Sequence, residues 1–220
     1  MRINRFIASC TNFSRRRADE LIKESKITIN DKLVSDFSYQ VKDSDVVKID
    51  GEEISLQHFV YYAVNKPLGY TSTTADTHAQ KLVTELVPEL PSVFPVGRLD
   101  KNSTGLIILT NDGDFSQKVQ HPSFQHEKEY IIKFSKPFHK SDKEKLEKGI
   151  ELEEGRAFFD NIKIINNHEV RITMHQGWKR QIRRMFSEIG FDNIELHRVR
   201  IQKLKLGLLK PGQYKVIKPE

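Results

Sequence analysis

The sequence predicts an α+β protein with two domains, the second of them built mainly on antiparallel sheet. Its 220 residues correspond to one or two domains of ordinary size. Apolar runs with the character of strands outnumber helical patterns, which favours antiparallel sheet over a doubly wound fold. A polar stretch near residues 55–59 ends a short first segment. We therefore expect one domain at residues 1–57 and another at 58–220.

Composition excludes several classes of protein. Hydrophobic residues make up 37% and charged residues 30% of the chain, enough for a packed core but too polar for a membrane protein. No apolar run approaches the ~20 residues that span a bilayer, and the N-terminus lacks a run of signal-peptide length. Cys10 is the one cysteine, and the eight histidines are scattered without the spacing of metal ligands. We expect a cytoplasmic protein, a monomer, with no metal and no membrane contact.

The first segment is predicted to form a small helical unit followed by short strands. Ser14 can cap a helix in which apolar residues recur at helical spacing from Ala18 to Ile22. The sequences KITIN and DKLV then predict two short strands joined by a turn at Asn30 and Asp31.

Strands and helices are mixed in the second segment. Four stretches are predicted strands: 106–110, 129–134, 157–165 and 169–174. Residues 78–87 and 141–150 are predicted helices. The latter has Ser141 and Glu144 at the spacing of a capping box.

A further helix is predicted at KRQIRRMFSEIG, residues 179–190. Its apolar residues fall at i, i+3, i+4 and i+7, namely Ile182, Met185, Phe186 and Ile189. At about 100° per residue, Arg180 and Arg184 project opposite this apolar stripe, whereas Arg183 lies at its border. A border arginine can reach a cleft beside the core, and the other two should face outward.

Familiar enzyme signatures are absent from the chain. It contains no GxSxG, GxxxxGK[ST], GxGxxG after a strand, or HExxH, which argues against an NTPase, a dehydrogenase and a zinc hydrolase. The remaining candidate for a functional site is residues 95–114, where a polar turn with Arg98 and Asp100 leads into an apolar strand. An acid beside such a strand is held rigidly. By composition alone, however, Asp100 is better explained as a loop acid that caps a turn.

Three motifs in the second segment resemble a known family. GRLDKNSTGLIILTNDGDF (97–115) resembles the active-site signature of the RsuA-type ribosomal pseudouridine synthases. EKEY (127–130) and GWKRQIRRMF (177–186) resemble that family's second and third motifs, in the same order. The first 57 or so residues resemble the S4 RNA-binding domain that precedes its catalytic domain. The resemblance implies a small S4-like α/β domain followed by a catalytic domain with a mainly antiparallel mixed sheet flanked by helices.

The activity implied by the resemblance is isomerisation of a uridine in ribosomal RNA to pseudouridine, without metal or organic cofactor. Asp100 would be the catalytic carboxylate, whether it attacks the sugar, attacks the base or acts through a glycal. Tyr130 would stack on the uracil and help remove the C5 proton, and Arg183 would be the partner of Asp100. Arg98 would hold the flipped nucleotide or fill the gap that it leaves.

The charge distribution predicts an RNA surface. The chain has a net charge of +6, and residues 174–218 hold 11 Lys and Arg against 3 Asp and Glu, which indicates a polyanionic partner. Cations in the first turn of a helix are disfavoured by the macrodipole, so local stability does not explain those that follow Ser14. The predicted phosphate contacts are Arg15, Arg16, Arg17, Lys179, Arg180 and Arg184.

Two other functions compete with the synthase. A noncatalytic S4-type RNA-binding or ribosome-assembly protein would need the basic surface but not the trio Asp100, Tyr130 and Arg183. A hydrolase of glycosidic bonds would usually need two carboxylates, and only one acid here has motif support. Among the synthases, HEKEY and QGWKRQIRRM are more similar to members that act on large-subunit (23S) ribosomal RNA.

Overall fold

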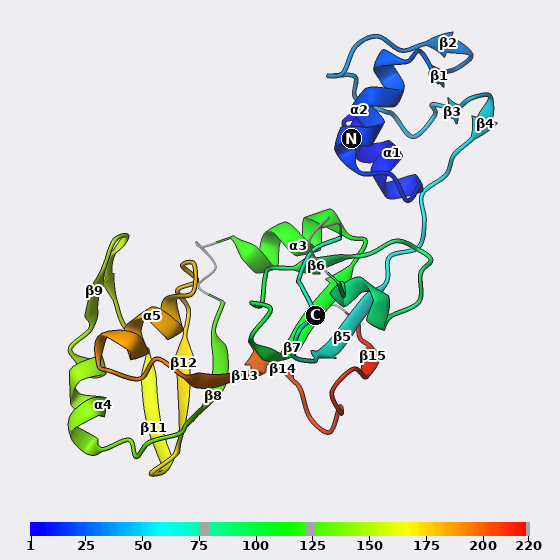
Figure 1. Ribbon diagram of the computed structural model, residues 1–220. Helices are drawn as coiled ribbons and strands as arrows, with labels where there is room; N and C mark the ends of the chain where they lie inside the picture. Colours follow the sequence, from blue (N-terminus) through cyan, green and yellow to red (C-terminus); the bar gives the residue numbers. More distant parts are fainter. Residues whose placement is uncertain (75–79, 122–125, 219–220) are drawn as a thin grey trace. The chain divides into compact units, whose positions relative to one another are not determined.

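The computed structural model describes residues 1–74, 80–121 and 126–218, which form two units (Figure 1). The first unit consists of Met1–Val60 together with Pro88–Val93. The second consists of Tyr61–Val87 and Phe94–Glu220, and it contains every residue for which the sequence predicts a catalytic role.

The first unit places two helices, α1 (Ile3–Cys10) and α2 (Arg15–Lys23), beside a four-stranded sheet. In the order β2-β1-β3-β4, the strands are Lys32–Leu33, Ile27–Ile29, Val47–Ile49 and Glu52–Glu53. The predicted cap of α2 is confirmed, because Ser14 Oγ accepts a hydrogen bond from the Arg17 amide at 3.1 Å. The predicted turn is confirmed too. Asn30 and Asp31 have positive φ angles of 51° and 65°, as a tight turn between antiparallel strands requires.

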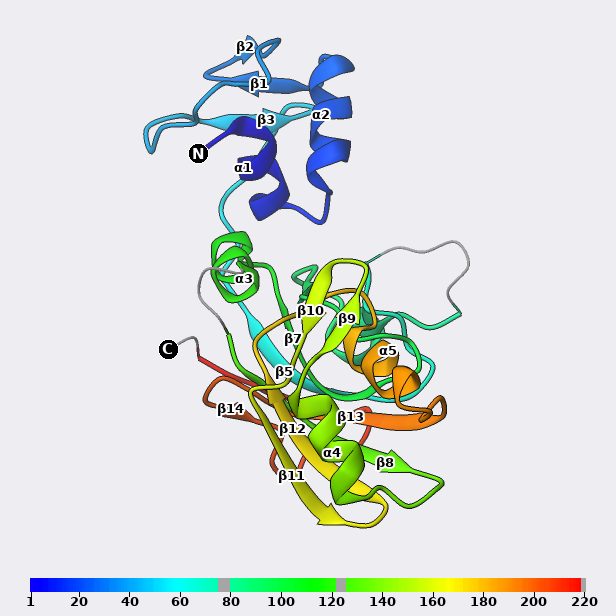
Figure 2. The same ribbon diagram turned by 90° about the vertical axis from the view of Figure 1, so that its left-hand side faces the viewer.

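The second unit is built on one large sheet with the order β11-β12-β8-β13-β7-β5-β15 (Figures 1 and 2). In that order, the strands are Asn161–Asn166, Glu169–Met174, Lys128–Phe134, Ile194–Ile201, Thr104–Thr110, Tyr61–Lys66 and Tyr214–Val216. The strand β14 (Leu204–Lys205) pairs with β13, and β6 (Phe94–Val96) pairs with β7. Among the described strands, only β13 and β7 run parallel, so the predicted mainly antiparallel mixed sheet is confirmed.

Helices cover this sheet at several places. They are η1 (Val83–Leu86), α3 (Gly113–Gln120), α4 (Lys140–Glu147) and α5 (Gln181–Glu188). The ring of Phe186 on α5 packs on Phe134 of β8 with centroids 5.3 Å apart. On α3, Phe115 contacts Tyr61 of β5 edge to face at 5.1 Å. Ile182, Met185 and Phe186 are all buried, which confirms the apolar stripe predicted for α5.

Two predicted elements were wrong because long-range pairing overrides local pattern. The stretch 157–165 is not one strand. It contains the end of β10 (Gly155–Ala157), which forms a hairpin with β9 (Ile150–Leu152), and most of β11. The predicted helix 78–87 is only the single turn η1, with residues 78–79 outside the described ranges. Just before it the chain is extended, because the Thr71 amide donates to Lys81 O and the Val83 amide to Thr71 O.

The predicted start of α4 was also wrong. The helix begins two residues earlier, with His139 rather than Ser141 at the N-cap. The Asp142 carboxylate accepts a hydrogen bond from the His139 amide at 3.0 Å. This bond satisfies a backbone donor that the helix itself leaves unpaired, so Asp142 determines where the helix starts.

Candidate active site

One row of residues crosses the centre of the large sheet. Lys66 on β5 lies opposite Gly105 on β7, and Gly105 lies opposite Arg198 on β13. Arg198 in turn lies opposite Tyr130 on β8, which lies opposite Ile172 on β12. Directly opposed residues of a sheet point to the same face. The register therefore brings Lys66, Arg198 and Tyr130 to one face of the sheet.

Gly105 makes the centre of this row possible. Its φ is +106°, and a Cβ atom built on it would lie 2.2 Å from the carbonyl oxygen of Arg198. No other residue type can adopt this backbone conformation at such a close approach. Beside it, Thr104 Oγ1 and His197 Nδ1 lie 2.8 Å apart and join the same two strands. The parallel pairing of β7 with β13 thus depends on glycine at position 105.

Asp100 lies in the loop that leads from β6 into β7. Its side chain is half-buried, and none of the hydrogen bonds within the described residues involves its carboxylate. The loop is fixed on both sides of it. The Ser103 amide donates to Asp100 O at 2.9 Å, and Leu99 exchanges hydrogen bonds with the Ser72 hydroxyl at 2.7 and 3.2 Å. Arg98 is exposed. The backbone is therefore held while the carboxylate stays available.

Arg183 contacts the turn that follows Asp100. Its guanidinium donates to Asn102 O at 2.5 Å, to Ser103 Oγ at 3.1 Å and to Ile194 O at 2.8 Å. Burial lowers the pKa of Arg183, as does Arg180, and the negative charge of Asp100 opposes this. Within the described residues no ion pair joins Arg183 to Asp100. The partnership expected for these two side chains stays a prediction, and the contacts observed fix the loop.

Lys66 is a site residue that the sequence analysis missed. Its side chain is fully buried, and Nζ donates to the carbonyl of Pro67 at 2.9 Å. Burial lowers the pKa of Lys66 to about 8, Asp100 opposes that change, and Arg198 adds to it. The sequence does contain a feature that could have identified Lys66. This lysine follows the mostly apolar run YYAVN and directly precedes the turn PLG. Such a lysine cannot easily reach solvent.

We expect this buried lysine to make stability depend on pH. The pKa of Lys66 is about 8 in the folded protein against an ordinary value of 10.5. Between these values the unfolded chain binds more protons, so the free energy of unfolding rises with pH. Compared with Lys66→Met, the wild-type protein should gain up to about 3 kcal/mol across this interval. Urea unfolding at a series of pH values measures the difference, and parallel curves for the two proteins would contradict it.

Tyr130 is buried on β8, with 7% of its surface exposed. Its hydroxyl makes no hydrogen bond to the described residues. Lys128, two residues earlier on the same face, is half-buried and directs Nζ at His175 O over 3.4 Å. Burial lowers the pKa of Lys128, and the charge of Arg198 lowers it further. One face of β8 thus presents an aromatic ring and a cation side by side.

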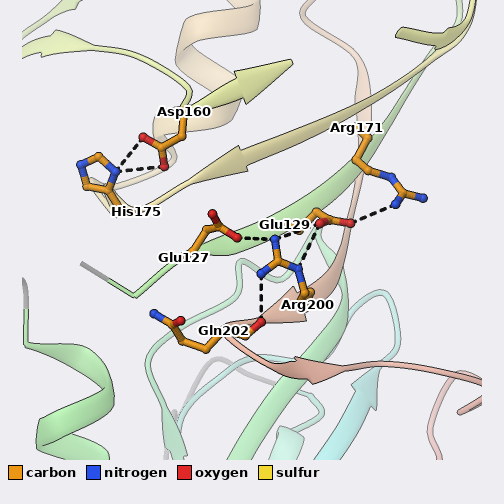
Figure 3. Close-up of polar contacts among 7 residues, drawn as sticks. All are labelled: Glu127, Glu129, Asp160, Arg171, His175, Arg200 and Gln202. Atoms are coloured by element: carbon orange, nitrogen blue, oxygen red, sulfur yellow. Dashed lines mark hydrogen bonds and ion pairs between the residues drawn. The ribbon is translucent and has the colours of Figure 1, made fainter. Parts of the chain in front are cut away.

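The opposite face of β8 carries an ion network, drawn in Figure 3. Arg200 on β13 donates to Glu129 from Nε at 3.0 Å and from Nη2 at 2.9 Å, and it also binds Glu127. Arg171 on β12 pairs with Glu129 at 3.2 Å. The network spans three strands at the bulge between Arg198 and Arg200. It therefore fixes the register in which Arg198 stands opposite Tyr130.

Breaking this network should destabilise the second unit. Glu129→Gln leaves Arg200, whose side chain is 20% exposed, without its main carboxylate. We expect a loss of about 1–3 kcal/mol in the free energy of unfolding. The control is Glu147→Gln, which removes an exposed helical pair with Lys143 and should cost less than about 0.5 kcal/mol. If both variants lose the same free energy of unfolding in urea denaturation, the network contributes no more to stability than an exposed ion pair does.

Several predicted RNA contacts have partners within the protein. Both terminal nitrogens of Arg184 bind Glu154 at 2.8 Å, and this ion pair raises the pKa of Arg184. Arg184 was expected to face outward, but it is half-buried because Glu154, in the turn of the β9–β10 hairpin, binds it. Arg17 pairs with Glu20 and Glu24. Exposed positions are Arg15, Arg16, Lys179 and Arg180.

The described residues contain neither a cluster of potential metal ligands nor a membrane-spanning helix. No group of three or more His, Cys, Asp or Glu side chains that could hold a metal ion occurs among them. No helix in that part of the chain has both the length and the apolar character needed to cross a membrane.

Comparison with known proteins identifies both units. Residues 1–47 match the family model for the S4 domain, and residues 60–188 match that for RNA pseudouridylate synthase. Ribosomal large subunit pseudouridine synthase B of Bacillus subtilis is 36% identical over 225 residues, which cover 99% of this chain and 92% of that protein. Dual-specificity RNA pseudouridine synthase RluF of Escherichia coli is 35% identical over 218 residues, covering 98% and 74%.

A solved structure agrees with these matches. A crystal structure of a pseudouridylate synthase superposes on this chain with a TM-score of 0.71 and 26% sequence identity. The superposition covers 99% of this chain and 96% of the other, so the likeness extends over both units.

Proposed function

The chain belongs to the RNA pseudouridylate synthase family, with an S4 domain ahead of the catalytic unit, and from this premise we propose that it isomerises a uridine of large-subunit ribosomal RNA through Asp100. The relatives that share its whole length are named as ribosomal or RNA pseudouridine synthases. The observation that carries the assignment of Asp100 is its available carboxylate on a fixed loop, close enough to Lys66 and Arg183 to raise their pKa values.

The reaction exchanges one bond of the ribose for another. The glycosidic bond from C1′ to N1 of uracil breaks, the base rotates, and a bond from C1′ to C5 forms. The proton on C5 leaves to a base, and N1 gains a proton, so no atom is lost and no oxidant or reductant is needed. A carboxylate serves this chemistry as a nucleophile toward C1′ or C6, or as the base that forms a glycal.

Electrostatics support Asp100 in this role. Lys66 and Arg183 are both close enough for Asp100 to raise their pKa values. Two cations therefore lie near the carboxylate that is proposed to react.

The other catalytic residues are proposed on their positions. Tyr130 offers a buried ring and a hydroxyl that has no hydrogen-bond partner among the described residues, suited to stack on uracil and to take part in removing the C5 proton. Arg183 is proposed to hold the Asp100 loop at Asn102. Arg98 is exposed two residues before Asp100, and we propose that it holds the flipped nucleotide.

The wider RNA surface is proposed at exposed cations. Arg15 and Arg16 on the first unit, with Lys179 and Arg180 before α5, are exposed and suited to phosphate. Arg17 and Arg184 are weaker candidates for phosphate contacts. Each already pairs with a carboxylate and would have to break that ion pair to bind RNA.

Mapping pseudouridine in total RNA tests the proposal. RNA from a strain that lacks this protein should lose one or a few pseudouridines in large-subunit ribosomal RNA, and supplying the protein should restore them. Restoration by Asp100→Asn would refute the catalytic assignment. A loss confined to another RNA would refute the choice of target. An unchanged map, with binding to ribosomal RNA retained, would favour a noncatalytic role.

A further inference from the structure

The face of the sheet that carries Lys66, Arg198 and Tyr130 has more positive than negative charge. Lys66, Lys128 and Arg198 project from three strands of this face, with Arg183 beside the Asp100 loop. Asp100 is the carboxylate that acts on Lys66 and Arg183, and among the described residues none acts on Lys128. Buried charges of one sign are costly unless a partner or ligand offsets them.

Arg198 is the least compensated of these cations. Only 3% of its surface is exposed. Its Nε donates to Leu106 O at 2.6 Å. Nη2 is fully buried without a hydrogen-bond partner, and within the described residues Nη1 has none either. A buried donor that lacks a partner costs free energy, and in a native protein it needs an explanation.

The position of Arg198 supplies the explanation. It lies directly opposite Tyr130, and next to Gly105, whose missing side chain leaves no group between Arg198 and Lys66 in the row. Asp100 lies close enough to Lys66 to change its pKa. A base stacked on Tyr130 with its ribose at Asp100 would therefore have its edge near the guanidinium.

The chemistry of the reaction creates negative charge on that base. If Asp100 attacks C1′, or if a glycal forms, the C1′–N1 bond breaks and its electron pair stays with uracil, where it spreads to the carbonyl oxygens. If Asp100 instead adds to C6, the electrons of the C5–C6 double bond move onto the C4 carbonyl oxygen. In every route that the sequence leaves open, a uracil carbonyl oxygen becomes an oxyanion.

We propose that Arg198 is a further catalytic residue, whose guanidinium binds a carbonyl oxygen of the target uracil and stabilises the negative charge that forms there. The inference rests on the proposed function. Donors aimed at developing charge in a site without water are among the largest contributions to catalysis. The pKa values of Lys66 and Lys128, both lowered by Arg198, agree with a positive charge at Arg198 that acts across this face of the sheet.

Burial favours a uracil oxygen over an RNA phosphate as the ligand. A phosphate is charged before it binds and would have to lose its hydration to reach a side chain that is 3% exposed. A uracil oxygen is neutral on entry and gains its charge only during the reaction. Arg198 would then bind the transition state more strongly than the substrate, which accelerates the chemical step.

The test uses a short RNA that contains the mapped target uridine, made with oxygen or with sulfur at C2 or at C4. Sulfur accepts hydrogen bonds poorly but carries negative charge more readily than oxygen. Single-turnover rates at saturating enzyme give the ratio of the oxygen rate to the sulfur rate for each position. In Arg198→Gln we expect this ratio to fall at least about tenfold at one of the two positions. Sulfur at that position carries the developing negative charge without the arginine, so the sulfur substrate is slowed less than the oxygen substrate.

Rate and affinity separate this role from a structural one. Arg198→Gln should slow the chemical step by about 10²-fold or more while its affinity for the RNA stays within about threefold. Arg198→Lys keeps a charge without the planar fork, so it should recover part of the rate and serves if the glutamine variant does not fold. The control, Lys133→Gln, removes an exposed cation on the opposite face of β8 and should react normally.

The outcomes distinguish this inference from the proposed function. Wild-type protein that forms no pseudouridine in the unmodified RNA refutes both. If the wild-type protein turns over normally and the folded Arg198 variants keep its oxygen-to-sulfur ratio, the role of Arg198 is refuted and the proposed function stands. A loss of affinity with an unchanged chemical step would assign Arg198 to a phosphate instead, and this also overturns the proposal.

Discussion

Asp100→Asn is expected to lower pseudouridine formation by about 10³-fold or more, the loss typical when a reacting carboxylate is removed. The change replaces one oxygen by an amide and removes the negative charge, while the turn formed by Asp100 O and the Ser103 amide remains. Affinity for RNA should change little, because the exposed cations proposed to meet phosphate lie elsewhere in the chain.

The measurement is a single-turnover assay at saturating enzyme, together with binding of the same RNA. Asp114→Asn is the matched control, since Asp114 belongs to the same stretch of residues 97–115 but lies in the first turn of α3. It should react at close to the wild-type rate. If Asp100→Asn turns over nearly as fast as the control, the carboxylate is not the reacting group.

Gly105→Ala is expected to be the most damaging structural substitution. The added Cβ would lie 2.2 Å from Arg198 O and 2.6 Å from Arg198 N, and the φ of +106° is unfavourable for alanine as well. Because both nearest atoms belong to the backbone, no side chain can move aside, and β7 must separate from β13. We expect a loss of about 3 kcal/mol or more in the stability of the second unit.

Gly207→Ala separates the two causes. Gly207 also has a positive φ, +64°, but a Cβ there would meet nothing within 4 Å. Gly207→Ala introduces the unfavourable backbone conformation without a steric clash. We expect it to lower the free energy of unfolding by only about 1 kcal/mol. Urea unfolding, followed by a signal from the second unit, gives both values. If the two variants lose similar amounts, the close approach of β7 and β13 is not what requires glycine at position 105.

Local signals in the sequence were reliable where the structure itself is local. Ser14 caps α2 because its hydroxyl meets an amide three residues away, and the apolar stripe of α5 follows from helical spacing alone. The motif around Asp100 identified the loop before β7. These features need no knowledge of what packs against them.

The remaining site residues depend on partners far away in the chain. Lys66 and Arg198 become neighbours of the site only through their shared register with Gly105, which no local pattern encodes. Arg184 turns inward because Glu154, 30 residues earlier, binds it. Helical spacing gives the direction of a side chain from its own helix but says nothing of a hairpin that covers that direction.

The parallel pairing of β7 with β13 also has a consequence for how the protein is made. Thr104 and His197, which it joins, are separated by 93 residues, so closing this loop carries a large entropic cost and slows folding. During synthesis the first unit and the β5–β7 pair can form early, because their strands are already available. The parts of the proposed site can meet only after β13 has left the ribosome. The site is therefore assembled only once β13, the last of the strands that contribute to it, has been synthesised.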